Sequence, residues 1–350
     1  MRVAMEAASL GLSSGGLARY TSELSLALAR CFPQDEFLLL SDQPFSMPPE
    51  APPNLKHGGG PRTAAERRWW LWGFGREARR WQADLVHGPD FAVPYLPQLA
   101  SVMTLHDLSP WMESGWHHAA QRVRRRCRVL LNLGIPTMVV THTEAVRKQA
   151  IERFRISPER IVAVPSAAAS WIRPVETSPP RPYFLYVGTL EPRKNLPMLV
   201  DAWREVRRDY EIDLVLAGRR RSDGPQFAQE AGLRLAGEVP DRQLAELYSG
   251  ALAFVYPSLY EGFGLPIVEA MQCGACVITS SACREAGGGA ALYADSPAQL
   301  VGAMRQVASD PQLVTGRRVQ SLARAREFSW DRSARLTYEV YEEARRRFGR

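Results

Sequence analysis

Short apolar runs alternate with helical stretches along both halves of the chain, and this alternation constrains the fold more than any other sequence feature. The runs include Met1–Met5, Glu36–Leu40 and Thr137–Thr141, and the pattern begins again at Tyr183–Val187. Strands that alternate with helices in this way form parallel sheets with helices on both faces. The sequence therefore predicts an α/β protein with two Rossmann-like, doubly wound parallel-sheet domains.

A proline-rich segment, Ala167–Arg181, marks the boundary between the two halves. Prolines stiffen a chain and interrupt regular elements, so such a segment is typical of a linker. A chain of 350 residues also exceeds what one hydrophobic core usually fills. The expected division is an N-terminal domain at 1–168, a linker at 169–182, a C-terminal domain at 183–328 and a final helix within 329–350.

The stretch Tyr256–Gly274 combines a strand end, a glycine-rich turn and a helix start, which Pro266 fits as the first helical residue. Free amides at a helix start bind phosphate, and here they would come from the turn Gly262, Phe263, Gly264 and Leu265. Two acids, Glu261 and Glu269, bracket this turn. Carboxylates beside a phosphate would repel it, so we expect them to bind neutral hydroxyl groups, such as those of a sugar.

The first half contains two further candidates for ligand contact. Gly15 and Gly16 lie between a strand and a helix, as in mononucleotide-binding units, but without the G-x-G-x-x-G fingerprint. An ordinary tight turn explains them equally well. His106 follows the apolar run Val102–Leu105, and ligands of open α/β sheets lie beyond the carboxyl ends of strands. Local packing or capping is the alternative for His106.

Basic residues lean toward the first half, where residues 1–170 carry 20 Lys and Arg against 15 Asp and Glu. Many of them accompany tryptophans in Arg62–Gln82 or gather in His117–Leu133. Such helices fit an anionic membrane surface, or they are core helices with solvated arginines. Nucleic acid is not expected as a partner, since two acids at the centre of the candidate site oppose a polyanion there.

Five cysteines, an odd number without a regular spacing, indicate a reducing compartment. Cys273 and Cys276 lack partners for a four-ligand metal site, so we interpret them as small apolar residues and expect no metal. The start of the chain lacks the apolar core of a signal peptide, and no run approaches the length of a membrane span. We expect a cytoplasmic protein, either free or peripheral on the inner membrane face.

Four motifs together resemble the retaining glycosyltransferases of family four, which have the GT-B fold: Gly15–Tyr20, His106-Asp107, Gly188–Lys194 and Glu261-x7-Glu269. The chain looks most like bacterial mannosyl and hexosyl transferases of polysaccharide or glycolipid synthesis. The resemblance implies two domains facing a cleft, a final helix that crosses back to the first domain, and a nucleotide-diphosphate sugar as donor substrate. It also implies a saccharide or lipid-linked saccharide acceptor, and neither a metal nor a cofactor. Among nucleotide sugars, we expect GDP-mannose as the donor.

The resemblance also implies roles for individual residues. Glu261 corresponds to the acid on the sugar side of the donor, and Glu269 to the acid that binds the ribose. Lys194 corresponds to the lysine on the diphosphate, and His106 to the residue that approaches the transferred sugar. The predicted catalytic residues are therefore His106, Lys194 and Glu261, and Gly15 and Gly16 are expected to close over the phosphates.

One position departs from the family pattern. Family members often carry arginine directly after the strand glycine, Gly188, where this chain has Thr189. Arg193 is the expected replacement, because it lies one residue from Lys194. Cations at these positions would stabilise the departing diphosphate without a metal. A sugar-nucleotide epimerase of the same architecture is the alternative enzyme, and it would form product without an acceptor.

Overall fold

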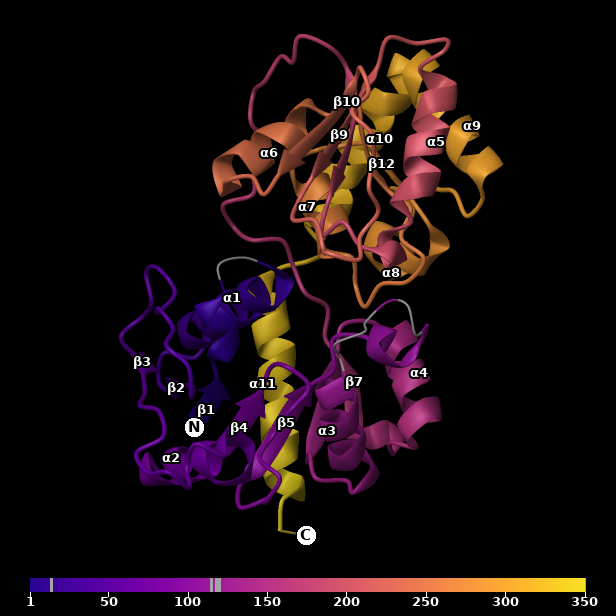
Figure 1. Ribbon diagram of the computed structural model, residues 1–350. Helices are drawn as coiled ribbons and strands as arrows, with labels where there is room; N and C mark the ends of the chain where they lie inside the picture. The colour runs from indigo at the N-terminus through magenta and orange to yellow at the C-terminus, as the bar shows by residue number, and fades with distance from the viewer. Residues whose placement is uncertain (13–14, 114–115, 117–120, 350) are drawn as a thin grey trace. The chain divides into compact units, whose positions relative to one another are not determined.

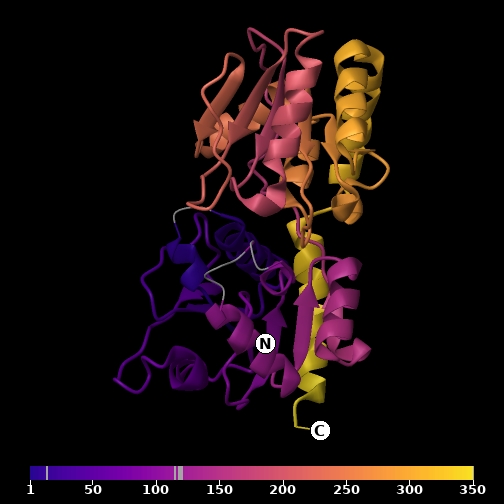
Figure 2. The ribbon, with the colours of Figure 1, turned by 45° about the vertical axis from the view of Figure 1, so that its right-hand side comes forward.

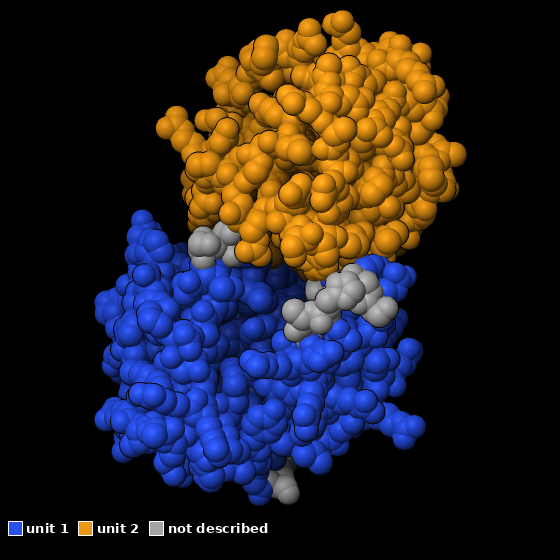
Figure 3. Space-filling model, in the orientation of Figure 1, with its two compact units in different colours: residues 1–166, 329–350 blue, residues 167–328 orange. Residues whose placement is uncertain are grey.

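The structure is a computed structural model that describes residues 1–12, 15–113, 116 and 121–349. The chain forms two compact units, coloured separately in Figure 3. Unit 1 contains Met1–Ser166 and Ser329–Arg350, and unit 2 contains Ala167–Phe328. Each unit is built around its own parallel sheet (Figure 1), which confirms the prediction of two Rossmann-like α/β domains.

The sheet of unit 1 has seven strands in the order β3-β2-β1-β4-β5-β6-β7. All neighbouring strands pair in parallel. The strands are β1 (Arg2–Glu6), β2 (Glu36–Leu40), β3 (Leu55–His57), β4 (Leu85–Gly88), β5 (Ala100–Thr104), β6 (Met138–Thr141) and β7 (Ile161–Ala163). Because the strands are parallel, the carboxyl ends of β1, β4, β5 and β6 lie along one edge of the sheet, and the strand order reverses between β1 and β4.

Helices of unit 1 bury one apolar face each. In α1, Tyr20, Leu24 and Leu28 are buried at the predicted helical spacing, and α4 begins where the Thr143 side chain accepts a hydrogen bond from the Val146 amide. The helices are α1 (Gly16–Cys31), α2 (Phe74–Arg80), α3 (Gln121–Asn132), α4 (Glu144–Phe154) and α11 (Trp330–Arg347). Part of the predicted helix His117–Leu133, residues 117–120, lies outside the described residues.

The C-terminal helix α11 belongs to unit 1 and lies along β5 and β6, as Figures 1 and 2 show in yellow. Tyr341 is fully buried and its hydroxyl lies 2.7 Å from Nδ1 of His87. Tyr338 stacks on Phe32, which directly follows α1, with ring centroids 3.7 Å apart. These contacts explain why a helix without a following strand is stable here, because its apolar face completes the core of the first sheet.

The tryptophan-rich segment packs partly into the core of unit 1. Trp69 is buried with Phe74 and Val86, at the start of a π-helical turn (Trp69–Gly73) that leads into α2. Trp70 packs against the same cluster, and the Arg126 guanidinium lies 5.0 Å from its ring. Trp69 is therefore a core residue, as the alternative to a membrane-binding helix predicted, whereas Arg67 and Arg68 are exposed to solvent.

The sheet of unit 2 has six parallel strands in the order β10-β9-β8-β11-β12-β13. They are β8 (Tyr183–Val187), β9 (Asp213–Ala217), β10 (Leu233–Gly237), β11 (Ala253–Tyr256), β12 (Val277–Thr279) and β13 (Leu292–Tyr293). The helices are α5 (Leu196–Val206), α6 (Asp241–Gly250), α7 (Leu265–Gln272), α8 (Arg284–Gly287), α9 (Pro297–Ser309) and α10 (Pro311–Ala325). Figure 1 shows α5 and α9 side by side over this sheet.

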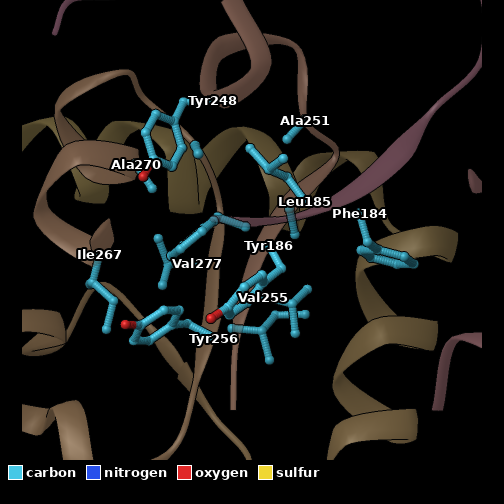
Figure 4. Close-up of a cluster of buried hydrophobic side chains, with 14 of the residues drawn as sticks. Phe184, Leu185, Tyr186, Tyr248, Ala251, Val255, Tyr256, Ile267, Ala270 and Val277 are labelled. Carbon is cyan, nitrogen blue, oxygen red and sulfur yellow. The ribbon is translucent and has the colours of Figure 1, made fainter. Parts of the chain in front are cut away.

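The core of unit 2 includes the central strands and the inner faces of α5, α6, α7 and α9. Figure 4 shows Tyr186 of β8 beside Tyr256 of β11, and their rings stack with centroids 5.6 Å apart. Cys273 and Cys276 are buried in the same apolar cluster. Of the expected linker 169–182, Ala169 is buried in this core and its carbonyl accepts a 2.9 Å hydrogen bond from Gln272, so this segment lies in unit 2.

Candidate functional site

The loops after β8 and β11 meet where the strand order of unit 2 reverses. In open α/β sheets this switch point is where ligands bind, outside the carboxyl ends of the strands. On the other side of β8 the backbone is closely packed, since a Cβ atom at Gly218, directly after β9, would lie 2.1 Å from the carbonyl oxygen of Gly188. The loop after β8 then forms a short 3-10 helix, Pro192–Lys194, which buries the side chains of Arg193 and Lys194.

Lys194 and Glu261 form a buried ion pair at this switch point. The Lys194 ammonium lies 2.5 Å from Oε1 of Glu261 and 2.6 Å from the Tyr256 hydroxyl. The two charged side chains are 7% and 8% exposed. The ammonium also lies over the Tyr256 ring. The structure thus joins two predicted catalytic residues from the loops after β8 and β11.

Two further donors hold the Glu261 carboxylate. The Ser258 hydroxyl donates to Oε1 at 2.6 Å, and the Arg193 guanidinium lies 3.1 Å from Oε2. Burial on its own raises the pKa of Glu261, but Arg193 and Lys194 outweigh it and lower that pKa to about 2. Burial, together with Arg193, lowers the pKa of Lys194, and Glu261 opposes this. Glu261 is therefore an ionised carboxylate.

Arg193 is bound by protein acceptors on several sides. It donates to the Tyr260 carbonyl at 2.6 Å and to Oε1 of Glu191 at 2.8 Å, in addition to its contact with Glu261. These bonds tie the loop after β8 to the loop that carries Glu261. The predicted contact between Arg193 and a diphosphate stays a prediction, and it would require some of these bonds to be exchanged.

Arg221 and Glu191 extend the network, and sequence analysis missed both. Arg221 donates to Oε2 of Glu191 at 2.6 Å and also pairs with Asp223. Arg221 follows β9, which neighbours β8, and the backbone of Leu190 bridges to that of Arg220. The basic triplet Arg219–Arg221 after an apolar strand was the available signal, because neighbouring strands place their following loops side by side.

Glu269 occupies a separate position on α7. Its side chain is buried, and Oε2 accepts a hydrogen bond of 3.0 Å from the Tyr248 hydroxyl. The turn before α7 contains Gly264 at a φ of 92°, which a residue with a side chain rarely adopts. Phe263 packs edge-on against Phe328, so it anchors the turn, and Leu265 begins α7. A role for Gly262 and its neighbours in phosphate binding stays a prediction.

In unit 1, His106 is bonded through both ring nitrogens. Nε2 lies 2.6 Å from the Pro89 carbonyl oxygen, and Nδ1 lies 2.8 Å from Nε2 of His142. His142 was not among the predicted site residues, although it follows β6 as His106 follows β5. Gly15 precedes α1 at a φ of 121° and Gly16 begins the helix, and residues 13–14 before them lie outside the described part.

Among the described residues, no group of three or more His, Cys, Asp or Glu side chains is arranged to hold a metal ion. No helix among them is long and apolar enough to cross a bilayer.

Comparison with known proteins identifies the family. Residues 14–169 match the profile described as "Glycosyltransferase Family 4", and residues 181–310 match "Glycosyl transferases group 1". An O-antigen chain mannosyltransferase B from Escherichia coli is 33% identical over 292 residues, which cover 75% of each chain. The chain belongs to glycosyltransferase family four. The predicted resemblance to this family and the predicted enzyme class, a glycosyltransferase, are thereby confirmed.

Solved structures agree with this family's fold. Sucrose-phosphate synthase from Thermosynechococcus elongatus matches with a TM-score of 0.77 and 19% identity, over 98% of both chains. HepE from Anabaena, solved in complex with UDP-glucose, matches with a TM-score of 0.74 and 17% identity over 98% of this chain and 100% of its own. The glycosyltransferase thus has the predicted GT-B fold.

Proposed function

We propose that this glycosyltransferase moves mannose from GDP-mannose to a saccharide or lipid-linked saccharide acceptor, with retention of configuration and without a metal ion. The name of the Escherichia coli relative supports the sugar and the polymeric acceptor. The observation that carries the proposal is the buried contact between Lys194 and Glu261 at the switch point of unit 2.

The chemistry of donor cleavage explains why a lysine is needed here. Negative charge accumulates on the diphosphate as the sugar leaves, and a fixed cation in a buried site stabilises that charge strongly. A diphosphate that binds Lys194 competes with Glu261 for the ammonium group. Donor binding therefore frees the Glu261 carboxylate from Lys194, and a free carboxylate accepts hydrogen bonds from sugar hydroxyls.

Glu261 is poorly suited to attack the sugar itself. Its carboxylate has a pKa lowered to about 2, and once Lys194 has turned to the diphosphate it still accepts from Arg193 and Ser258. A double displacement through this carboxylate would first have to break several charge-assisted hydrogen bonds. The environment supports retention by attack on the same face as the departing diphosphate, within an ion pair.

Activity of two variants tests the site. We expect Lys194→Met and Glu261→Gln to lower sugar transfer from GDP-mannose by about a hundred- to thousandfold, the usual effect of removing one such electrostatic contact. A matched control is Arg305→Gln, because Arg305 forms exposed ion pairs with Glu205 and Asp209. The control should stay within about twofold of the parent, as exposed pairs contribute little.

Two results would contradict the proposal. Parent-like transfer by Lys194→Met would show that the donor does not use this lysine. Product formed from the donor alone, with no acceptor present, would identify an epimerase instead.

The donor can be identified by thermal stabilisation with GDP-, UDP- and dTDP-sugars. A ligand at 100 times its Kd stabilises the folded state by about 2.7 kcal/mol. GDP-mannose is expected to raise the melting temperature most. A larger shift with a UDP- or dTDP-sugar would reassign the nucleotide.

We also propose peripheral attachment of unit 1 to anionic membranes through α3. Arg122, Arg125 and Arg128 are exposed and lie three residues apart, so they share one helix face. Val129, near the end of the same helix, is also exposed, and Leu133, 70% exposed, directly follows the helix. Cations beside exposed apolar side chains suit the interface of an anionic bilayer.

Sedimentation with lipid vesicles tests the attachment. Each arginine near an anionic surface contributes about 1 kcal/mol, so Arg125→Gln with Arg128→Gln should weaken binding to phosphatidylglycerol vesicles by about thirtyfold. Arg242→Gln with Arg305→Gln removes the same charge from unit 2, outside both arginine-rich segments of unit 1, and serves as the control. Equal binding to neutral and anionic vesicles would contradict the proposal.

A further inference from the structure

Three histidines follow or end neighbouring strands of unit 1, and two of them contact each other. His87 lies in β4, His106 follows β5 and His142 follows β6. Nδ1 of His106 lies 2.8 Å from Nε2 of His142. Nδ1 of His142 lies 3.1 Å from the Ser166 hydroxyl, which follows β7. With the contact between His106 and the Pro89 carbonyl, which follows β4, these hydrogen bonds form a row along the carboxyl edge of the sheet from β4 to β7.

The direction of these hydrogen bonds follows from their partners. A carbonyl oxygen only accepts, so Nε2 of His106 carries a hydrogen and donates to Pro89. A neutral imidazole has one such hydrogen, which leaves Nδ1 of His106 as an acceptor for Nε2–H of His142. Nδ1 of His142 is then also an acceptor, and the Ser166 hydroxyl, 3.1 Å away, donates to it. The Val164 carbonyl lies farther from the same nitrogen, at 3.4 Å, and would need a hydrogen there. The shorter contacts therefore favour one tautomer at each ring.

The surroundings keep both rings neutral and in place. Burial lowers the pKa of His106, against the opposing effects of Asp90, the Pro89 carbonyl and Asp107. Burial, followed by the influence of His106, lowers the pKa of His142 to about 3. Tyr20 of α1 packs edge-on against both rings, with centroids 5.0 Å away in each case.

Tyr20 is linked to the third histidine, His87, through Thr104. Its hydroxyl lies 3.1 Å from Oγ1 of Thr104, which lies 2.9 Å from Nε2 of His87. The other ring nitrogen of His87 contacts Tyr341 of α11. The two rings beyond β5 and β6 are thus held from α1, β4, β5 and α11.

We propose that His142 is a positioning residue of the transferase, which donates to His106 and holds it as the neutral Nε2–H tautomer bonded to Pro89. His106 then acts as a fixed, uncharged group and does not exchange protons with the substrate. The inference rests on the proposed function in one respect, namely that His106 belongs to the site where the sugar is transferred.

Two substitutions at position 142 separate positioning from simple packing. His142→Met keeps a long apolar side chain but removes the donor, and we expect kcat to fall about ten- to hundredfold, since a buried acceptor loses its partner. KM for the donor sugar should change by less than about twofold, because the loss concerns positioning. His142→Gln places an amide donor near the position of Nε2 and should recover most of kcat. His57→Met, at an exposed histidine stacked on Phe45, is the control and should keep parent kcat.

The pH profile gives a second readout. Without the donor from His142, the neighbouring Asp90 and Asp107 favour a protonated His106 ring. The acid limb of kcat should therefore move to higher pH in His142→Met. A variant with unchanged kcat and an unchanged acid limb would overturn the proposal.

The tautomers can be measured independently of activity. Nitrogen-15 NMR of histidine-labelled protein distinguishes protonated from unprotonated ring nitrogens, and it applies to the unmodified enzyme. We expect an unprotonated Nδ1 at His106, with loss of its hydrogen-bonded shift in His142→Met. A protonated Nδ1 at His106 in the parent would overturn the inference, whereas absent transfer activity with the expected spectrum would contradict only the proposed function.

Discussion

Replacement of Glu261 by glutamine tests the central ion pair of unit 2. The substitution keeps the shape of the side chain but leaves two cations, Arg193 and Lys194, without their shared carboxylate. Both side chains of the Lys194–Glu261 pair are less than one-tenth exposed, so solvent screens the lost charge poorly. Breaking a buried pair by removing one partner costs about 3–5 kcal/mol.

The pKa of Glu261 leads to a similar magnitude. Its value is lowered from 4.5 to about 2, and each pKa unit corresponds to about 1.4 kcal/mol, which amounts to about 3 kcal/mol of stability. A lowered acid pKa stabilises the folded state above the unfolded value. This contribution should be lost as the pH falls from about 4.5 to about 2, and Glu261→Gln should lack that part of the acid dependence.

Hydrogen exchange of amides in β8 and β11 measures this loss in unit 2 alone. A double-mutant cycle with Lys194→Met isolates the energy of the pair. Lys194→Met should lower the free energy of unfolding by at least about 2 kcal/mol less in the Glu261→Gln background than in the parent. A nucleoside diphosphate should also stabilise Glu261→Gln more than the parent, since it supplies the missing negative charge to Lys194. Additive effects to within about 0.5 kcal/mol would refute the coupling.

Three further predictions concern buried acids of the two units. Burial raises the pKa of Glu6 to about 8, so the free energy of unfolding should fall as the pH rises from about 4.5 to 8. Glu6→Gln should raise the free energy of unfolding by about 3 kcal/mol at pH 7, measured by urea unfolding. The same pH dependence of stability in the variant and the parent would contradict this. Tyr248→Phe removes the hydrogen-bond donor of buried Glu269 and should lower the stability of the folded state by about 1–3 kcal/mol. The melting temperature measures this loss, and Tyr210→Phe is the control. Glu191→Gln loosens Arg193 and Arg221 and should lower kcat about tenfold, whereas a parent-like rate would show that neither cation needs Glu191.

Much of the fold could be predicted because parallel strands and their helices leave strong local patterns. The strands at Glu36–Leu40 and Tyr183–Val187 coincide with the predicted runs. The extent of the linker could not be predicted from proline content alone. Ala169 and Ile172 are buried in unit 2, where Gln272 of α7 donates hydrogen bonds to both of their carbonyls, and this tertiary contact leaves no periodic signal.

The candidate site could be predicted in its residue types more than in its contacts. The sequence pointed to Lys194 and Glu261 separately, but their direct pairing depends on β8 and β11 being neighbours, which local patterns do not specify. Glu191, Arg221 and His142 were missed for the same reason. None of the three stands out within its own segment. Each has a role only because it contacts a residue in the loop after a neighbouring strand.

The different ways in which the two cations are held distinguish their parts in the proposed reaction. Arg193 bonds to the Tyr260 carbonyl, Glu191 and Glu261, and a planar guanidinium with several fixed partners is costly to reorient. Lys194 contacts the Tyr256 hydroxyl and Glu261 through one flexible ammonium group, whose donors can turn toward a new acceptor. Lys194 is therefore the cation that a diphosphate can recruit at the lower cost. In the proposed reaction, Arg193 then holds the loop of Glu261 while that exchange takes place.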